Sequence, residues 1–199
     1  KVFHEFKKIK PLRVFLGGFF WYNVGMQTII LMAAVFGSKV LGLESTQLIM
    51  MILMIQFVAI AGSYVFARLS EHTTNLYAVK IAVAVWMLVC FAAYFVQTAS
   101  QFFLVGACLG FVMGALQSLS RSTYSKMLPP TEDHTTYFSF YDVMEKLATT
   151  FGMFSIGLLE ALTGDLRNSA LSLTVFFALG LIQIFRVRGF EKIGTADAD

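Results

Sequence analysis

The sequence predicts an all-α membrane protein, a bundle of six transmembrane helices. Composition is the first reason: 57% of the 199 residues are hydrophobic and only 14% are charged, whereas soluble domains contain about 25% charged residues. The mean hydropathy of +0.72 agrees with this. The second reason is a series of six apolar runs, each close to the ~20 residues that cross a bilayer as a helix. The third is the charge of the connectors, which alternates along the chain.

Residues 1–12 are predicted to form a basic amphipathic linker helix. Val2, Phe3, Phe6 and Ile9 share one helical face, and four lysines surround it. This pattern is typical of a short helix that lies in the plane of the lipid headgroups. A disordered basic tail is the alternative.

Residues 13–188 are predicted to be the transmembrane domain, followed by a cytoplasmic tail at 189–199. Because lipid offers the backbone no hydrogen-bond partners, each crossing segment is a helix or a strand of a closed barrel. The apolar runs are longer than barrel strands and lack their alternation, so we expect helices. The six runs are 13–36, 47–67, 76–97, 102–124, 137–162 and 168–187.

Basic residues gather in every second connector. One side of the membrane receives ten of them, whereas the other side has only Lys39 and Arg167. By the positive-inside rule the basic side is cytoplasmic, so both termini are expected there, which requires an even number of spans. The ten residues are Lys1, Lys7, Lys8, Lys10, Arg13, Arg68, Lys126, Arg186, Arg188 and Lys192.

The fifth run contains three charged residues within two helical turns: Asp142, Glu145 and Lys146. A charge near the bilayer centre costs at least about 2.5–3.5 kcal/mol, so such residues are rare and face protein or water. Spacings of three and four place Asp142 beside the other two on one helix face. Two interpretations stay open. The side chains line a wet pathway enclosed by protein, or the span begins later and leaves them solvated at the membrane surface.

A stripe of glycines marks the fourth run. Gly106, Gly110 and Gly114 recur at intervals of four, which lets another helix backbone approach closely. We therefore expect a helix-packing seam. Gln117 and Arg121 continue the stripe, so the seam becomes polar toward the cytoplasmic end.

Arg121 is the charged residue of this stripe. Its guanidinium stays charged at any physiological pH, and it lies within about one helical turn of the expected membrane edge. The fifth run begins on the same side, so Arg121 and Asp142 are expected at similar depth. Our hypothesis is that Arg121 pairs with Asp142 or Glu145 across the two helices.

The first run carries Tyr22, Asn23 and Gln27, with the two amides four residues apart on one helix face. Amides in membrane helices either bind neighbouring helices through hydrogen bonds or line a polar cavity, and both interpretations stay open. Together with Gln117, Arg121 and the charged residues of the fifth run, these side chains form the predicted substrate or ion pathway.

No metal, cofactor or enzyme activity is predicted. Cys90 and Cys108 lie inside apolar runs, where a free thiol serves as a small packing residue. The three histidines form no metal-binding or nucleophile–base spacing. Because no basic stripe is interleaved with aromatic residues, nucleic acid is not an expected partner.

Four short stretches stand out by their amino-acid sequence and by their order along the chain. They are YNVGMQT at 22–28, QSLSRS at 117–122, FSFYDVMEK at 138–146 and TGDLRNSA at 163–170. They resemble the YNDGVQT, GTQALSRS, FFGFYDVSGK and TG-xx-R stretches of the autophagy-related vacuolar amino-acid effluxer family, a branch of the major facilitator superfamily. The resemblance covers nearly the whole chain.

Two places depart from the family's pattern. Val24 stands where the family has an acidic residue in the first stretch, so any role of that carboxylate is absent here. The loop after the second run resembles the superfamily's LADRxG signature loosely, with Thr74 where glycine is expected. Arg68 and Glu71 are the candidate gating residues of this loop.

The resemblance implies that the chain is the second six-helix half of a twelve-helix secondary transporter, in which substrate binds between the halves near the midplane. It further implies that a small polar solute, an amino acid or a related metabolite, moves by alternating access. The expected partners are membrane lipid, this substrate, and an N-terminal six-helix half in the same or a separate chain. A homodimer is expected where that half is absent.

Two questions about function stay open. Protonation of Asp142 and Glu145 either couples transport to a proton gradient, or these residues act only as a structural cytoplasmic gate. A non-transporting membrane scaffold or assembly partner is the alternative to a transporter.

Overall fold

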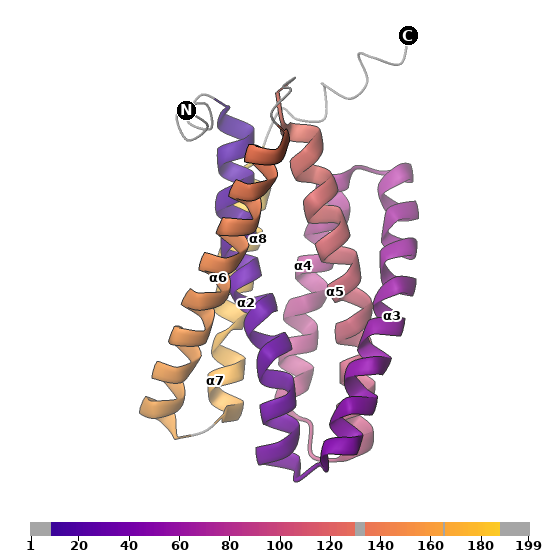
Figure 1. The fold of residues 1–199 in the computed structure, drawn as a ribbon, viewed down its shortest axis with the longest axis vertical. Helices are drawn as coiled ribbons and strands as arrows, with labels where there is room; N and C mark the ends of the chain where they lie inside the picture. The colour runs from indigo at the N-terminus through magenta and orange to yellow at the C-terminus, as the bar shows by residue number, and fades with distance from the viewer. Residues whose placement is uncertain (1–8, 130–133, 165, 188–199) are drawn as a thin grey trace.

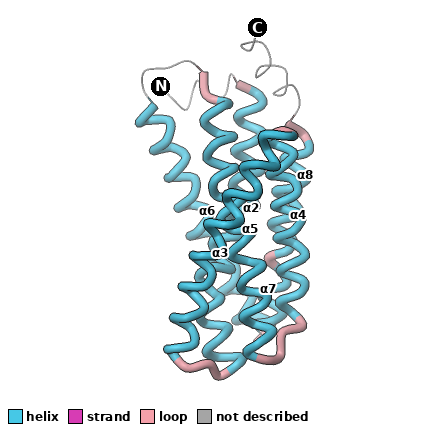
Figure 2. The backbone as a smooth tube through the Cα atoms, turned by 90° about the vertical axis from the view of Figure 1, so that its right-hand side faces the viewer, coloured by secondary structure: helices cyan, strands magenta, loops and turns pink. Residues whose placement is uncertain are grey.

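Long helices run side by side along one axis in the computed structural model (Figure 1), and a view turned by 90° shows the same bundle (Figure 2). The structure describes residues 9–129, 134–164 and 166–187, and no strand occurs among them. The all-α prediction is therefore confirmed. The helices are α2 (Lys10–Leu41), α3 (Ser45–His72), α4 (Asn75–Tyr94), α5 (Ala99–Met127), α6 (His134–Thr163), α7 (Leu166–Ser172) and α8 (Thr174–Phe185).

Local sequence signals set several helix ends. Pro11 lies in the first turn of α2, where its missing N–H breaks no helical hydrogen bond. Gly42 ends α2 with a left-handed backbone, φ 63°, a conformation that glycine adopts without strain. Thr98 starts α5 with a capping box. The predicted linker helix falls mainly on residues 1–8, outside the described residues, and α2 already begins at Lys10.

Five helical segments are long and apolar enough to cross a membrane: α2, α3, α4, α5 and the α7–α8 pair, taken together. Among the described helices α6 is not counted with them, because the charged residues of its first half interrupt its apolar sequence. With 30 residues it is still about 45 Å long, and it runs along the bundle next to α2 (Figure 1). The expected sixth span is interrupted at Leu173, between α7 and α8.

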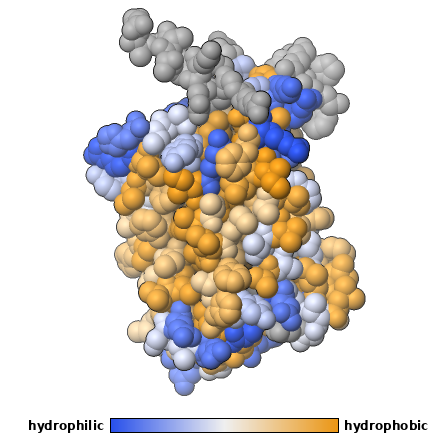
Figure 3. All heavy atoms as spheres, turned by 180° about the vertical axis from the view of Figure 1, so that it is seen from behind, coloured by the Kyte–Doolittle hydropathy of each residue, from blue (hydrophilic) through white to orange (hydrophobic). Residues whose placement is uncertain are grey.

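The two ends of the bundle differ in charge. α2 begins and α8 ends at the same end, the upper one in Figure 1. We call this the basic end, because Arg13, Arg68 and Lys126 lie there, whereas Lys39 and Arg167 lie toward the opposite end. Figure 3 shows a broad apolar band between the two polar ends, as a membrane-spanning surface requires.

Helices α3 and α5 contact each other backbone to backbone along the glycine stripe. A Cβ atom added at Gly110 would lie 2.7 Å from the carbonyl oxygen of Ile55, closer than packed atoms allow. Gly114 of α5 and Gly62 of α3 are also enclosed by backbone carbonyl groups of the facing helix. The stripe is thus the seam along which these two helices pack.

The remaining helices pack around α2, which contacts mainly α6 and α8. Trp86 of α4 stacks on Phe177 of α8 with 5.3 Å between ring centroids, and Gly25 of α2 leaves the room that the Phe177 ring occupies. α4 therefore connects the α3–α5 pair to the group formed by α2, α6 and α8.

The seam gives a prediction about stability. Gly110→Ala is expected to destabilise the fold by about 1–3 kcal/mol, because the added methyl group overpacks the α3–α5 contact. Gly157→Ala is the matched control: nothing lies within 4 Å of a Cβ atom there, so the change gains helix propensity of at most about 1 kcal/mol. Thermal unfolding midpoints in lipid nanodiscs measure both. Equal midpoints for the two variants would contradict the seam.

Candidate functional site

A polar pocket lies between α2, α5 and α6. Its volume is about 340 Å³. Four residues predicted for the substrate pathway line it, and they come from three different helices. The lining consists of Phe19, Asn23, Met26, Gln117, Ser118, Ser120, Arg121, Tyr141 and Glu145.

Arg121 and Asp142 form an ion pair that joins α5 to α6. The Nη2 atom of Arg121 donates to Oδ1 of Asp142 at 2.9 Å, and the guanidinium lies 5.5 Å from the centre of the Tyr141 ring. This is the pairing expected between Arg121 and a carboxylate of the fifth run. The two side chains are 57% and 55% exposed, so in water the pair contributes at most about 1 kcal/mol. It aligns the helices without locking them together.

Helices α5 and α6 meet at the basic end and diverge toward the opposite end (Figure 1). Where they meet, the hydroxyl of Tyr124 donates to the carbonyl oxygen of Tyr137 at 2.7 Å. The Tyr124 ring also packs against Phe138 and Tyr141. These aromatic contacts hold the two helices together beside the ion pair, and the pocket lies on the side to which the helices diverge.

Helix α2 forms the third wall of the pocket and binds both neighbours. Gln27 Nε2 donates to Glu145 Oε1 of α6 at 2.8 Å. Toward α5, the buried hydroxyl groups of Tyr22 and Ser120 lie 2.7 Å apart. Because Ser120 uses its one hydrogen on the Leu116 carbonyl, Tyr22 is the donor in this pair.

Asn23 is the exception among these polar groups. Its side chain is 1% exposed, and neither Oδ1 nor Nδ2 has a hydrogen-bond partner among the described residues. A buried amide left unpaired costs about 1–3 kcal/mol. Asn23 is nevertheless one of the residues that line the pocket.

Three predicted site residues lie away from the pocket. Lys146 is exposed on α6 and is not part of the lining. Arg68 and Glu71 pair with each other at 3.5 Å near the end of α3, where both are exposed, and Arg68 also donates to the hydroxyl of Tyr64. The candidate gating residues are thus separate from the pocket within this chain.

Several lining residues were not identified from the sequence. Ser118, Ser120 and Tyr141 lie inside two of the family-like stretches, which was the available signal for them. Phe19 and Met26 stand four residues before and three residues after Asn23, so helical spacing places them on the Asn23 face.

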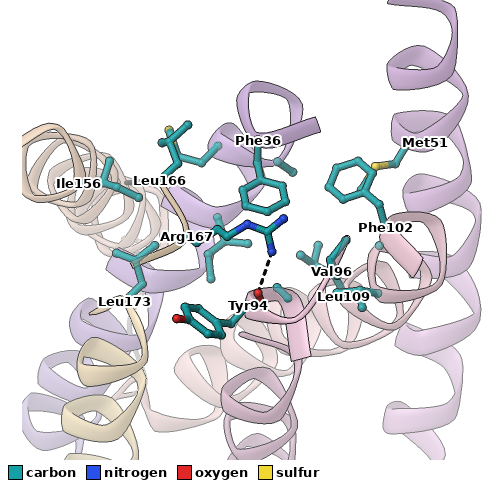
Figure 4. A pocket seen from close by; sticks show the side chains of 16 residues that line it. Phe36, Met51, Tyr94, Val96, Phe102, Leu109, Ile156, Leu166, Arg167 and Leu173 are labelled. Carbon is teal, nitrogen blue, oxygen red and sulfur yellow. Dashed lines mark hydrogen bonds between the residues drawn. The ribbon is translucent and has the colours of Figure 1, made fainter. Parts of the chain in front are cut away.

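A second pocket, of about 70 Å³, lies toward the opposite end (Figure 4). Its lining is almost entirely apolar. Arg167 reaches between Phe36 and Tyr94: its Nη1 donates to the Tyr94 carbonyl oxygen at 2.9 Å, and the guanidinium lies 5.5 Å from the Phe36 ring centre. The small volume and apolar walls do not suit a polar solute. No cluster of metal-binding side chains occurs within the described ranges.

Comparison with known proteins identifies the family. The model of the family described as vacuole effluxer Atg22 like matches residues 1–193. An uncharacterized MFS-type transporter of Bacillus subtilis, YxiO, is 30% identical over 88% of this chain and 41% of its own length. Autophagy-related protein 22 of Schizosaccharomyces pombe is 25% identical over 92% of this chain and 37% of its own length.

A further relative, autophagy-related protein 22 of Cryptococcus neoformans, is also 25% identical over 92% of this chain, and over 36% of its own length. The chain thus spans about two fifths of the length of these relatives. A family match over nearly every residue, together with several apolar helices able to cross a bilayer, leads to one conclusion. The chain belongs to the vacuole effluxer Atg22-like family of multi-pass membrane transport proteins.

Proposed function

We propose that the chain is the second six-helix half of a twelve-helix secondary transporter and that it moves a small polar solute by alternating access. The family's description as a vacuole effluxer and the name of one relative, an MFS-type transporter, support this proposal. The chain's share of the relatives' length, about two fifths, leaves room in them for another half of similar size. In such folds the substrate binds between two halves.

The polar pocket is the observation that carries the proposal. In a bundle whose surface is a broad apolar band, charged and amide side chains from α2, α5 and α6 converge on one space of about 340 Å³. Ionisable residues within membrane spans face protein or water and mark solute pathways. A purely structural bundle has no need for this concentration of polar groups.

We place the Arg121–Asp142 pair in the mechanism as a reversible brace at one edge of the pocket. It lies about 9 Å from the end of α5, where α5 and α6 meet. Because an exposed ion pair is weak, a small change in the contacts of α6 is enough to exchange it for other partners. Such exchange is what an alternating-access gate requires, whether or not a proton is coupled to it.

The basic end is assigned to the cytoplasm, with both termini on that side. The charge difference between the two ends supports this orientation through the positive-inside rule, and α6 is assigned as the sixth span. The solute is an amino acid or related metabolite, as proposed from the family resemblance. A six-helix N-terminal half, in the same or a separate chain, covers the pocket face, and a second copy of this chain does so in its absence.

Charge exchange across the brace tests the transport mechanism. In proteoliposomes that contain the complete transporter, Arg121→Asp and Asp142→Arg are each expected to slow efflux of a radiolabelled amino-acid mixture by about tenfold, or about 1.4 kcal/mol of barrier. The double variant restores the opposite charges and is expected to recover most of the rate, because residues in contact are energetically coupled.

Glu160→Gln is the control for this series. It removes the pairing of Glu160 with Lys39 at 3.6 Å, another exposed contact between α2 and α6, and is expected to change efflux less than about twofold. Failure of the double variant to recover any rate would contradict the brace. Efflux no faster than from protein-free vesicles would contradict transport and favour a membrane scaffold.

The orientation is tested by labelling single cysteines. Ser125 and Ser38 are both exposed and lie at opposite ends of the bundle, and Cys90 and Cys108 are first replaced by alanine. A membrane-impermeant maleimide is expected to label Ser125→Cys only in inside-out vesicles and Ser38→Cys only in right-side-out vesicles. The reverse pattern would place the basic end outside. Labelling of both cysteines from the same side of the membrane would contradict three crossings, α3, α4 and α5, between positions 38 and 125.

A further inference from the structure

Asn23 has a buried amide with no hydrogen-bond partner in the part of the chain that the structure describes. Buried polar side chains are almost always hydrogen-bonded, and an exception needs an explanation. Asn23 is 1% exposed, lines the pocket, and has neither its amide donor nor its amide acceptor paired among the described residues. A ligand that offers both an acceptor and a donor satisfies both atoms.

Glu145 gives the charge of that ligand. Arg121 is neutralised by Asp142, so the paired charges cancel at one edge of the pocket. Glu145 accepts a hydrogen bond from Gln27 at 2.8 Å, but an amide carries no charge, and none of the ion pairs in the described ranges includes Glu145. The pocket therefore holds one uncompensated carboxylate.

Asn23 of α2 and Glu145 of α6 are connected through Gln27. Gln27, which binds Glu145, is one helical turn from Asn23 on the same face of α2. A carboxylate on α6 and a neutral amide on α2 suit a primary ammonium group whose neighbouring carbon carries an acceptor such as a carboxylate or carbonyl.

We propose that Glu145 and Asn23 form the subsite that recognises a protonated amino group on the transported solute. Glu145 binds the ammonium through charge, and the Asn23 amide bridges the ammonium and the neighbouring acceptor. The inference rests on the proposed transport function and names the residues that select its substrate. Recognition led by Arg121 would instead favour solutes with a carboxylate alone.

Three probes of one shape separate these cases: valine, isobutylamine and 3-methylbutanoate carry both charges, only the ammonium, or only the carboxylate. Isothermal titration calorimetry on the complete transporter in nanodiscs measures their binding. Valine and isobutylamine are expected to bind at least about tenfold more tightly than 3-methylbutanoate. Equal or tighter binding of 3-methylbutanoate would overturn the proposal. A response to sodium chloride with none to isobutylamine would assign the subsite to an inorganic cation and also overturn it.

Two variants locate the subsite. Glu145→Gln keeps the shape and the Gln27 contact and is expected to weaken isobutylamine binding about tenfold or more, whereas Glu160→Gln, on the same helix but paired with Lys39 away from the pocket, is expected to leave that binding within about threefold. Asn23→Leu is expected to weaken valine binding and to raise the thermal unfolding midpoint, because it removes a buried unpaired amide. A lowered midpoint with unchanged binding would show that Asn23 is structural and would overturn its role.

Valine efflux from proteoliposomes, measured on the same variants, separates two kinds of failure. Efflux by the wild type that stays unchanged in Glu145→Gln and Asn23→Leu would overturn the subsite and leave the transport function standing. No efflux of any of the three probes by the wild type, with binding of isobutylamine intact, would overturn the transport function and leave the ammonium site standing.

Discussion

Hydrocarbon offers no hydrogen-bond partner to a charged or amide side chain, and this constraint decides where the polar residues of the bundle lie. Arg121 lies against Asp142, Gln27 against Glu145, and Tyr22 against Ser120, each pair joining two different helices. All three pairs involve α2, α5 or α6, so the polar groups collect in one place between these helices. The pocket lies among these pairs, and the apolar side chains of Phe19 and Met26 complete its lining.

The two kinds of helix contact in the bundle differ in strength and in freedom to move. Along α3 and α5, glycines bring backbones together so closely that Gly110 and Gly62 leave no space for a methyl group, and a seam of this kind does not slide. Between α5 and α6, by contrast, an exposed ion pair and a few aromatic contacts join helices that diverge. A shift of α6 against α5 therefore breaks weaker contacts than a shift of α3 against α5.

Much of this arrangement could be predicted from the sequence, because hydropathy and spacing are local properties. The apolar runs predicted the helices to within a few residues. The depth of Arg121 relative to the fifth run predicted a pair with Asp142 or Glu145, and the structure shows the pair with Asp142. Rotation of one helix against another is not local, and this explains the differences. Lys146 faces away from the pocket, the interruption at Leu173 was not expected, and the unpaired amide of Asn23 became visible only once every neighbour was placed.

The proposed function depends most on water reaching the polar pocket between α2, α5 and α6. Nitroxide labels at Gln117, which lines the pocket, and at Leu104, which is 67% exposed on the apolar surface of the same helix, compare the two environments. Electron paramagnetic resonance of the protein in nanodiscs then measures relaxation of each label by a water-soluble nickel chelate and by oxygen. A label at Gln117 is expected to respond mainly to the nickel chelate and a label at Leu104 mainly to oxygen. The same oxygen-dominated response at both positions would contradict a wetted polar pocket in this protein.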